Sequence, residues 1–359
     1  MRTVPLRIDG GRTTLPLVVN ATPDFSSFVQ RREHMAQEAR SARSVYAYGV
    51  DLRRTAWLDH SGVGEALMRA VDRRWSKLLE GLAVDTFQPE DQSPSTAVLQ
   101  QLVRLTEVLR CPRPAVRLLR GDVDPREWPI ATPLGTTHGG AHLLVLDANR
   151  LEALSAAEVT FTLTTALAHL QCDHGPIITA HLMAHRLRRG LGVVRRLLGP
   201  WTKVSVFSVD RAALLVIGDL PSTCEALATV GAPDAPWWPR MPAMGLRVRS
   251  LEDFDKSRVM ARIRLLHEST AAATATTTPD TDATADTPSE ELPEGAAATS
   301  SDDPVSDAER QADRLVEVQE AAEAASERES EQRMIEEQLR QAWSLARCDQ
   351  RLTRRLGLL

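Results

Sequence analysis

The sequence has few cysteines, few aromatic residues and no long apolar run. Its four cysteines are spread over 359 residues without a CxxC pair. Neither a disulfide framework nor a cysteine-type zinc knuckle is therefore expected, and a reducing compartment fits best. No stretch reaches the roughly 18 uncharged apolar residues that a membrane span needs. We expect a chain without transmembrane segments.

An excess of positive charge is also lacking. The formal net charge is −5 and the sequence pI is about 6.0, which argues against the global basic field on which nucleic-acid binders depend. The amino-terminal stretch MRTVPLRIDGGRTTLPLVVN has no long apolar segment, so a secretory signal peptide is not expected. These features predict a cytoplasmic protein with no nucleic-acid partner.

The composition changes abruptly where an acidic segment begins. Between Glu268 and Asp307 there are ten acidic residues, no Lys or Arg and no aromatic residue. Such a segment cannot bury enough apolar surface to offset the entropy that is lost when it becomes ordered. The sequence therefore predicts a domain over 1–267, a disordered acidic linker over 268–306 and a helical segment over 307–359.

The segment after the linker has a composition that favours helix, with many Ala, Glu, Gln and Arg residues. Ser306 and Glu309 have the spacing of a capping box. The apolar positions follow helical spacing in two short groups with an interruption between them. Two interpretations stay open, a solvated helix or a coiled-coil arm that docks a partner protein.

The first 267 residues show mixed patterns that predict one α+β domain, mostly helical with a small sheet. Short apolar runs predict strands at 114–119 and 141–146, and the second forms a hairpin with 129–135. Apolar residues at helical spacing predict helices over 24–44, 65–83, 93–110, 155–173, 177–198, 203–217, 221–230 and 240–265.

Histidines are concentrated in one part of this domain. Six of the nine lie between residues 138 and 185, which suggests a metal site. On a helix, residues four apart share a face, whereas residues five apart diverge by about 140°. His169 is therefore expected to be able to share a metal with Asp173, but not readily with His174.

The order of these elements resembles the soluble branch of the zinc metallopeptidases typified by HtpX and the CAAX prenyl protease. Their strand, lead-in and HExxH helix are similar to GGAHLLVLDANRLEALSAAEVTFTLTTALAHLQCDHG. Their later helix with Glu-x-x-Ala-Asp is similar to VFSVDRAALLVIGDLPSTCEALATVG, and PRMPAMGLRVRSLEDF lies where that family has a His-Pro stretch. The resemblance covers roughly residues 30–265 and implies a zincin-like fold.

The resemblance also implies that the active site is degenerate. In HExxH the two histidines bind zinc and the glutamate activates the zinc-bound water. His169 occupies the first histidine position, Leu170 the general-base position and Asp173 the second histidine position. Val206 occupies the position of the third ligand, and Asp210 matches an aspartate that supports the ligands. A two-ligand site binds zinc weakly, and leucine cannot accept a proton.

These replacements predict a pseudopeptidase with no catalytic residue and no required cofactor. It would bind a peptide or protein in the remnant cleft, where the family binds peptide as an added strand. One alternative is an active zinc-dependent endopeptidase with substitute ligands such as His169, Asp173 and Asp210. Another is a scaffold that acts through its C-terminal helix. The ordinary interpretation of His169 is a buried histidine beside Asp210, and that of residues 173–176 is a helix end.

Three other features have ordinary interpretations that we favour. His181 and His185 share a helix face without a third ligand, which indicates polar positions on a core helix. The run RLRRGLGVVRRLL at 186–198 is typical of a solvated face. It is also compatible with a membrane-surface helix or with binding of an acidic partner, the chain's own linker included. Trp237 and Trp238 favour core or turn packing.

Overall fold

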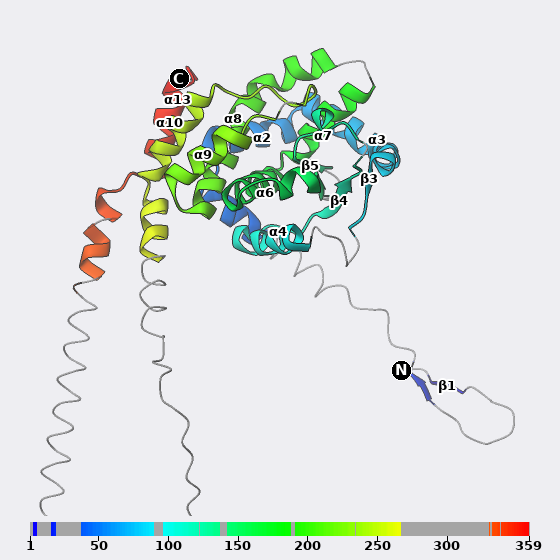
Figure 1. Cartoon of the computed structure of the whole chain (residues 1–359), viewed down its shortest axis with the longest axis horizontal. Coiled ribbons are helices and arrows are strands. Elements are labelled where there is room, and N and C mark those ends of the chain that lie inside the picture. Colours follow the sequence, from blue (N-terminus) through cyan, green and yellow to red (C-terminus); the bar gives the residue numbers. More distant parts are fainter. Residues whose placement is uncertain are drawn as a thin grey trace, which may run out of the picture. The chain divides into compact units, whose positions relative to one another are not determined.

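The computed structural model describes residues 3–5, 16–18, 37–89, 96–121, 123–136, 142–187, 191–233, 235–266, 330, 332–337 and 339–358. Figure 1 shows the chain coloured from blue at the N-terminus to red at the C-terminus. Contacts between its residues divide the chain into two units, Met1–Val248 and Arg249–Leu359. The boundary between these units lies before the change in amino-acid composition, which begins after residue 267. The predicted linker lies outside the described residues, as does the part of the predicted C-terminal helix up to residue 329.

The first unit is mostly helical with a small sheet, which confirms the predicted α+β class. Within the described residues, helical conformation is present from residue 37, and residues 24–36 of the predicted helix 24–44 lie outside them. The elements of this unit are β1 (Thr3–Pro5), β2 (Pro16–Val18), α2 (Gly49–His60), α3 (Gly62–Asp85), β3 (Thr86–Phe87), α4 (Thr96–Leu109), β4 (Ala115–Leu119), η1 (Pro125–Glu127), β5 (Ala131–Gly135), β6 (His142–Leu146), α5 (Ala148–Glu152), α6 (Ala156–Gln171), α7 (Gly175–Arg186), α8 (Leu191–Ile217), α9 (Leu220–Val230) and the start of α10 (Met244–Asp255).

The main sheet is mixed and has the strand order β3-β4-β6-β5. β4 and β6 are parallel, and each pairs antiparallel with an edge strand, β3 and β5 respectively. The predicted hairpin is confirmed, with Ala131 opposite Leu146 and Gly135 opposite His142. β1 and β2 form a separate antiparallel pair.

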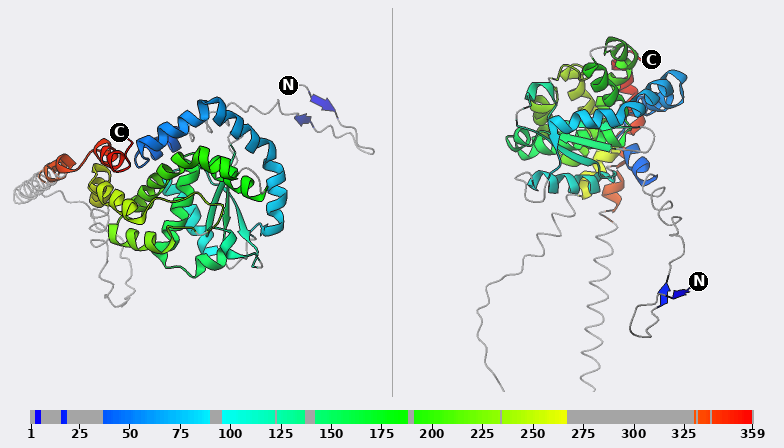
Figure 2. Two further views of the ribbon diagram at one scale, coloured as in Figure 1. Left: turned by 90° about the horizontal axis from the view of Figure 1, so that it is seen from above. Right: turned by 90° about the vertical axis from the view of Figure 1, so that its right-hand side faces the viewer.

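Strand β6 lies between two apolar layers, which explains its uninterrupted apolar sequence. Leu144 and Leu146 belong to a cluster with residues of α4 and α6, whereas Leu143 and Val145 belong to a cluster with residues of α3 and α7. Successive side chains of a strand point to opposite faces of its sheet. Both faces are therefore covered by helices, and Figure 2 shows α2 and α3 curving around one side of this unit.

Three helix predictions were wrong in their extent, since the predicted helix 240–265 begins at residue 244 and is interrupted at residues 256 and 257. The predicted helix 177–198 is two helices, since α7 ends at Arg186 and α8 begins at Leu191. The predicted helix 203–217 is the second half of α8, which continues from Leu191 to Ile217. The helix passes through Pro200, which lacks the N–H that would bond the carbonyl of Arg196. Helix α2 was not predicted, because two of its three buried residues are polar and its apolar pattern is weak.

The second unit contains the end of α10, a helical stretch over 258–266 and helix α13 (Leu345–Arg355). Cys348 and Leu352 are the buried residues of α13. The Cys348 thiol donates to the carbonyl oxygen of Asp253, 3.2 Å away, and the Asp253 carboxylate pairs with Arg355. These contacts hold α13 against the end of α10 within the unit.

Among the described residues, no helix is both long enough and apolar enough to cross a membrane.

Candidate functional site

A cleft with a volume of about 120 Å³ opens in the first unit, beside His169. Its walls come from the end of η1 to β5, from α5, α6 and α8, and from the chain that follows α9. Most lining side chains are apolar, and Phe161, Val206 and Trp238 are among them. Histidine, arginine and threonine are the polar residue types that line it, and no carboxylate, thiol, lysine or tyrosine does so among the described residues.

Helix α6 carries His169 into this cleft. The helix begins with a capping box, in which Ser155 accepts from the backbone of Glu158 and the Glu158 carboxylate accepts from that of Ser155. Most of its residues are buried, so the helix runs through the interior. His169 lies in its last turn, is 7% exposed and lines the cleft.

The ring of His169 contacts that of His174, although the two residues are five apart. Their Nδ1 atoms are 2.9 Å apart and both rings are buried. The expectation that the two side chains diverge was wrong, because α6 ends at Gln171 and Asp173 has a φ of 60°. The left-handed backbone of Asp173 turns the chain into α7, and this turn carries His174 back toward His169. The predicted helix end at 173–176 is confirmed.

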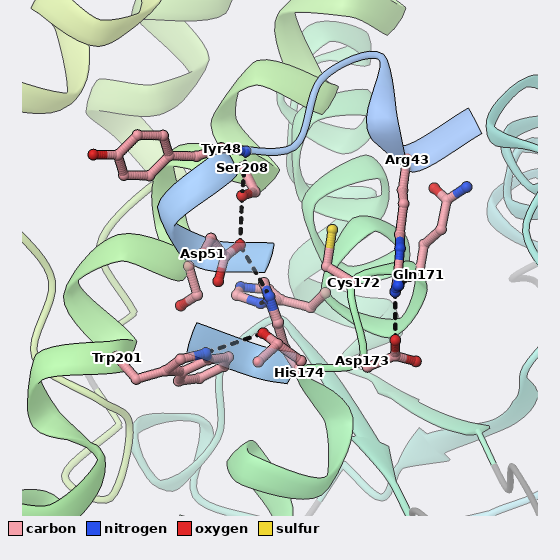
Figure 3. A network of polar contacts seen from close by, with 12 residues as sticks. Arg43, Tyr48, Asp51, Gln171, Cys172, Asp173, His174, Trp201 and Ser208 are labelled. Carbon is pink, nitrogen blue, oxygen red and sulfur yellow. Dashed lines mark hydrogen bonds and ion pairs between the residues drawn. The ribbon is translucent and has the colours of Figure 1, made fainter. Parts of the chain in front are cut away.

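His174 also faces a buried carboxylate from α2. Its Nε2 lies 3.1 Å from Oδ2 of Asp51, and both side chains are completely buried (Figure 3). The contact has the length of a hydrogen bond without its alignment, since Nε2 has no well-directed acceptor. The same Oδ2 accepts from the hydroxyl of Ser208, and Oδ1 has no hydrogen-bond partner in the described part of the chain.

We assign the tautomers of the two rings from these contacts, because the ring protons follow from the hydrogen-bond network. A proton on Nε2 of His174 is favoured by the carboxylate of Asp51 beside it. His174 then accepts at Nδ1 from the Nδ1–H of His169. Nε2 of His169 therefore keeps its lone pair. Burial, followed by the charges of His174 and Arg247, holds the pKa of His169 well below its ordinary value, so its ring is neutral near pH 7.

Asp173 does not take part in this cluster. Its carboxylate pairs with Arg43 and is 52% exposed. It lines a different pocket, near α2 and α3, together with His142. The structure therefore does not bring the two candidate metal ligands, His169 and Asp173, to one site.

The other residues implied by the resemblance have distinct surroundings. Leu170 is 4% exposed and does not line the cleft, whereas Val206 is 1% exposed and lines it beside His169. Asp210 accepts from Nε and Nη2 of Arg247 at 2.8 and 2.6 Å, with both side chains buried. Asp210 is thus bonded to an arginine of the stretch PRMPAMGLRVRSLEDF, and the expected pairing with His169 is not present.

One group of residues in the described part of the chain has the composition of a metal site. Potential ligand atoms of Asp51, Cys172 and His174 lie within 4.8 Å of one another, and all three side chains are buried. Carboxylate, thiolate and imidazole are ligands that zinc accepts. Burial raises the pKa of the Cys172 thiol, so without a cation this cysteine stays protonated. A cation at this closed position would have no open face for a substrate.

Sequence reasoning missed the roles of Asp51 and His174. Asp51 lies in α2, which has little apolar periodicity, and nothing near it in the sequence indicates a distant histidine. Cys172 and His174 were visible in the fragment ALAHLQCDHG. Their proximity depends on the turn at Asp173, and a simple helix rule does not include it.

Comparison of the chain with protein-family models found no match, and comparisons with curated proteins and with solved structures found none either. The metallopeptidase resemblance thus depends on the pattern of residues alone.

Proposed function

We propose that this chain is a non-catalytic peptide-binding protein, a pseudopeptidase built like the zinc metallopeptidases typified by HtpX. The observation that carries the proposal is the lining of the cleft. Among its described residues, His169 is the one candidate proton acceptor, and it is not accompanied by a carboxylate or a thiol.

Peptide hydrolysis requires either an activated nucleophile or a metal-bound water. A catalytic zinc usually has three protein ligands and one open position. Here Val206 lines the cleft where the resemblance implies a third ligand, and Asp173 is bound to Arg43 outside it. Leu170 cannot act as a base. General-base catalysis alone contributes roughly 10²–10⁴ in rate, so its loss together with two ligands leaves no route to hydrolysis.

The cleft is suited to one apolar side chain of an extended peptide. Its apolar walls bury such a side chain, and Nε2 of His169 can accept a peptide N–H. The edge strand β5 supplies Ala131 and Pro133 to the same cleft. Burial of one large apolar side chain contributes about 1.5–3 kcal/mol, which is sufficient for weak, side-chain-specific recognition.

Addition of a full strand to β5 is not part of the proposal. The N–H and the carbonyl oxygen of Gly135 both bond the hydroxyl of Thr179, at 3.0 and 3.1 Å. These groups therefore point away from β6, and by the two-residue period so do those of Pro133, which has no N–H. Two of the positions that an added strand would use are thus blocked, so the peptide is anchored by a side chain.

A selection from a displayed library of random peptides tests the proposal. The bait is the full chain, compared with a Thr165→Trp variant. Thr165 lines the cleft and is half-buried, and its hydroxyl bonds only the carbonyl of Thr162 in its own helix. A tryptophan there fills the cleft without removing a tertiary hydrogen bond. The matched control is Ala156→Trp, which adds the same side chain at an exposed position of the same helix.

We expect enriched peptides to share one aliphatic or aromatic position. They should bind the wild type and Ala156→Trp equally and Thr165→Trp at least tenfold more weakly. They should also stay intact when incubated with the protein and equimolar zinc, as measured by mass spectrometry. Enriched peptides that bind both variants equally, or that are cut, contradict the proposal.

A second candidate function is favoured by the group of Asp51, Cys172 and His174. A zinc ion held there would be a structural cofactor, because the site is closed. His169, whose Nδ1 contacts His174, would then support a ligand without being one. This candidate shares the prediction of no peptidase activity. It differs in requiring about one zinc per chain that is lost when Cys172 is replaced.

A further inference from the structure

A second pocket lies in the first unit, between α7, the first half of α8 and the chain near residue 240. Its volume is about 380 Å³, and it shares no lining residue with the cleft beside His169. Helix α7 supplies His181, helix α8 supplies Arg195, Arg196 and Lys203, and Arg240 completes the polar lining together with Thr202.

The charge of this pocket is of one sign. It is lined by three arginines and one lysine, and no aspartate or glutamate lines it. Within the described residues, none of these four cations forms an ion pair. Nη2 of Arg195 donates to the carbonyl oxygen of Pro236, which orients the guanidinium, and its Nε has no hydrogen-bond partner among the residues that the structure describes. In a chain of net charge −5, such a concentration of unpaired cations indicates a site that attracts anions.

His181 provides an independent observation that points to a ligand. Its side chain is 1% exposed and lines the pocket, yet neither ring nitrogen has a hydrogen-bond partner in the described part of the chain. Buried polar groups are nearly always hydrogen-bonded, so an unpaired imidazole calls for an explanation. Burial, followed by the charge of Arg195, lowers the pKa of His181 to about 4. The ring is therefore neutral near pH 7 and offers one N–H donor.

We propose that this pocket binds a small molecule through a phosphate or pyrophosphate group. Guanidinium and ammonium groups are the usual partners of phosphate oxygens, and arginine can donate two parallel hydrogen bonds. The ring N–H of His181 adds a directed donor at the buried end. The pocket is larger than inorganic phosphate, which leaves room for an organic substituent.

This assignment gives a role to part of the run RLRRGLGVVRRLL. Arg195 and Arg196 come from its second half. Their side chains line a pocket with a buried polar group, which neither a solvated helix face nor a membrane-surface helix requires. The acidic segment 268–307 of the same chain is the competing occupant, and the experiment separates it from a free ligand.

Isothermal titration calorimetry with sodium pyrophosphate, in a phosphate-free buffer of low ionic strength, tests the proposal on the full chain. The pocket variant is Arg196→Glu with Lys203→Glu, since both side chains are exposed and are not needed for packing. The matched control is Arg74→Glu with Lys77→Glu, which makes the same charge change at exposed positions of α3. A third variant, His181→Leu, removes the buried donor and puts an apolar side chain in its place.

We expect one saturable site per chain in the wild type and in the control. The pocket variant should bind at least tenfold more weakly, and His181→Leu severalfold more weakly with an unchanged salt dependence. Absence of saturable binding in the wild type overturns the proposal, and so does equal weakening in the pocket variant and the control. A chain with its ten acidic residues at 268–307 changed to amides is also titrated. If it binds and the wild type does not, the occupant is the chain's own acidic segment.

Discussion

The imidazole rings of His169 and His174 lie with their Nδ1 atoms 2.9 Å apart in the interior of the first unit. Asp51 lies on the far side of His174, 3.1 Å from its Nε2. A buried carboxylate and two buried histidines thus form a line from α2 to the cleft. This line fixes the orientation of His169, and burial keeps its ring neutral. Among the described residues, no carboxylate or thiol lines the cleft beside it.

Attempted restoration of the zinc motif should fail. The variant Leu170→Glu, Asp173→His, Val206→Glu reproduces HExxH and the third ligand in sequence. Residue 173 lies beyond the end of α6, so a histidine there cannot share a face with His169. We expect the variant to contain no more than roughly 0.1 zinc per chain above the wild-type content, because a site without well-placed ligands binds zinc weakly. We also expect no peptidase activity. About one added zinc per chain would show that α6 can extend through residue 173.

Breaking the buried pair of Asp210 and Arg247 should destabilise the first unit strongly. Removal of one partner leaves an uncompensated buried charge, which costs about 3–5 kcal/mol. Asp210→Asn and Arg247→Leu should each lower the free energy of unfolding by that order, as measured by urea denaturation. The double variant should recover part of the loss, because it leaves no charge behind. Single-variant effects below about 1 kcal/mol would indicate that the pair is accessible to water.

Stability should fall in mild acid. The pKa of His181 is lowered to about 4 and that of His169 is also lowered. Near pH 6.5 the unfolded chain takes up protons that the folded chain does not, so the free energy of unfolding decreases as the pH falls below this value. At about 1.4 kcal/mol per pKa unit, His181 alone accounts for a loss on the order of 3 kcal/mol between pH 6.5 and 4.

Urea denaturation at pH 7.5, 6 and 5 measures this effect, with His181→Leu as the comparison. The variant should be at least as stable as the wild type at pH 7.5, because it removes a buried ring without hydrogen bonds. Its stability should fall less between pH 7.5 and 5. Parallel curves for the two proteins would show that His181 does not titrate in this way.

The attachment of helix α13 within the second unit should depend on Asp253. This carboxylate is 4% exposed and pairs with Arg351 and Arg355 of the helix. Asp253→Ala should increase amide hydrogen exchange across α13 by about tenfold, a loss of roughly 1.4 kcal/mol of local stability. The control is Asp255→Ala, which removes a pair with Arg264 and should leave exchange in α13 unchanged. Unchanged exchange in both variants would mean that α13 is held by other contacts.

Local patterns predicted much of the fold. The apolar run HLLVL predicted β6, and apolar residues at helical spacing predicted α3, α4, α6 and α9. Trp237 and Trp238 are buried, as expected. These elements carry their signal in their own residues, since each presents a regular apolar side to the core.

Elements with a polar buried side were missed. Helix α2 buries Asp51 and Thr55, so a hydrophobic pattern does not reveal it. The site was also predicted in part, because one half of it has a sequence signal and the other half does not. His169 and Val206 line one cleft as the resemblance implies, whereas the contact of His174 with Asp51 joins distant parts of the chain. Such a contact depends on tertiary packing and has no local signature.

Zinc content, measured by elemental analysis of the tag-free chain purified without chelators, tests the central claim most directly. Wild type, His169→Ala and Cys172→Ala are compared. We predict that His169→Ala has the same zinc content as the wild type, because a histidine without a second ligand in the cleft binds zinc weakly. About one zinc per chain that is lost in His169→Ala and kept in Cys172→Ala would place a metal in the cleft. That result would contradict the account of a non-catalytic peptide-binding protein.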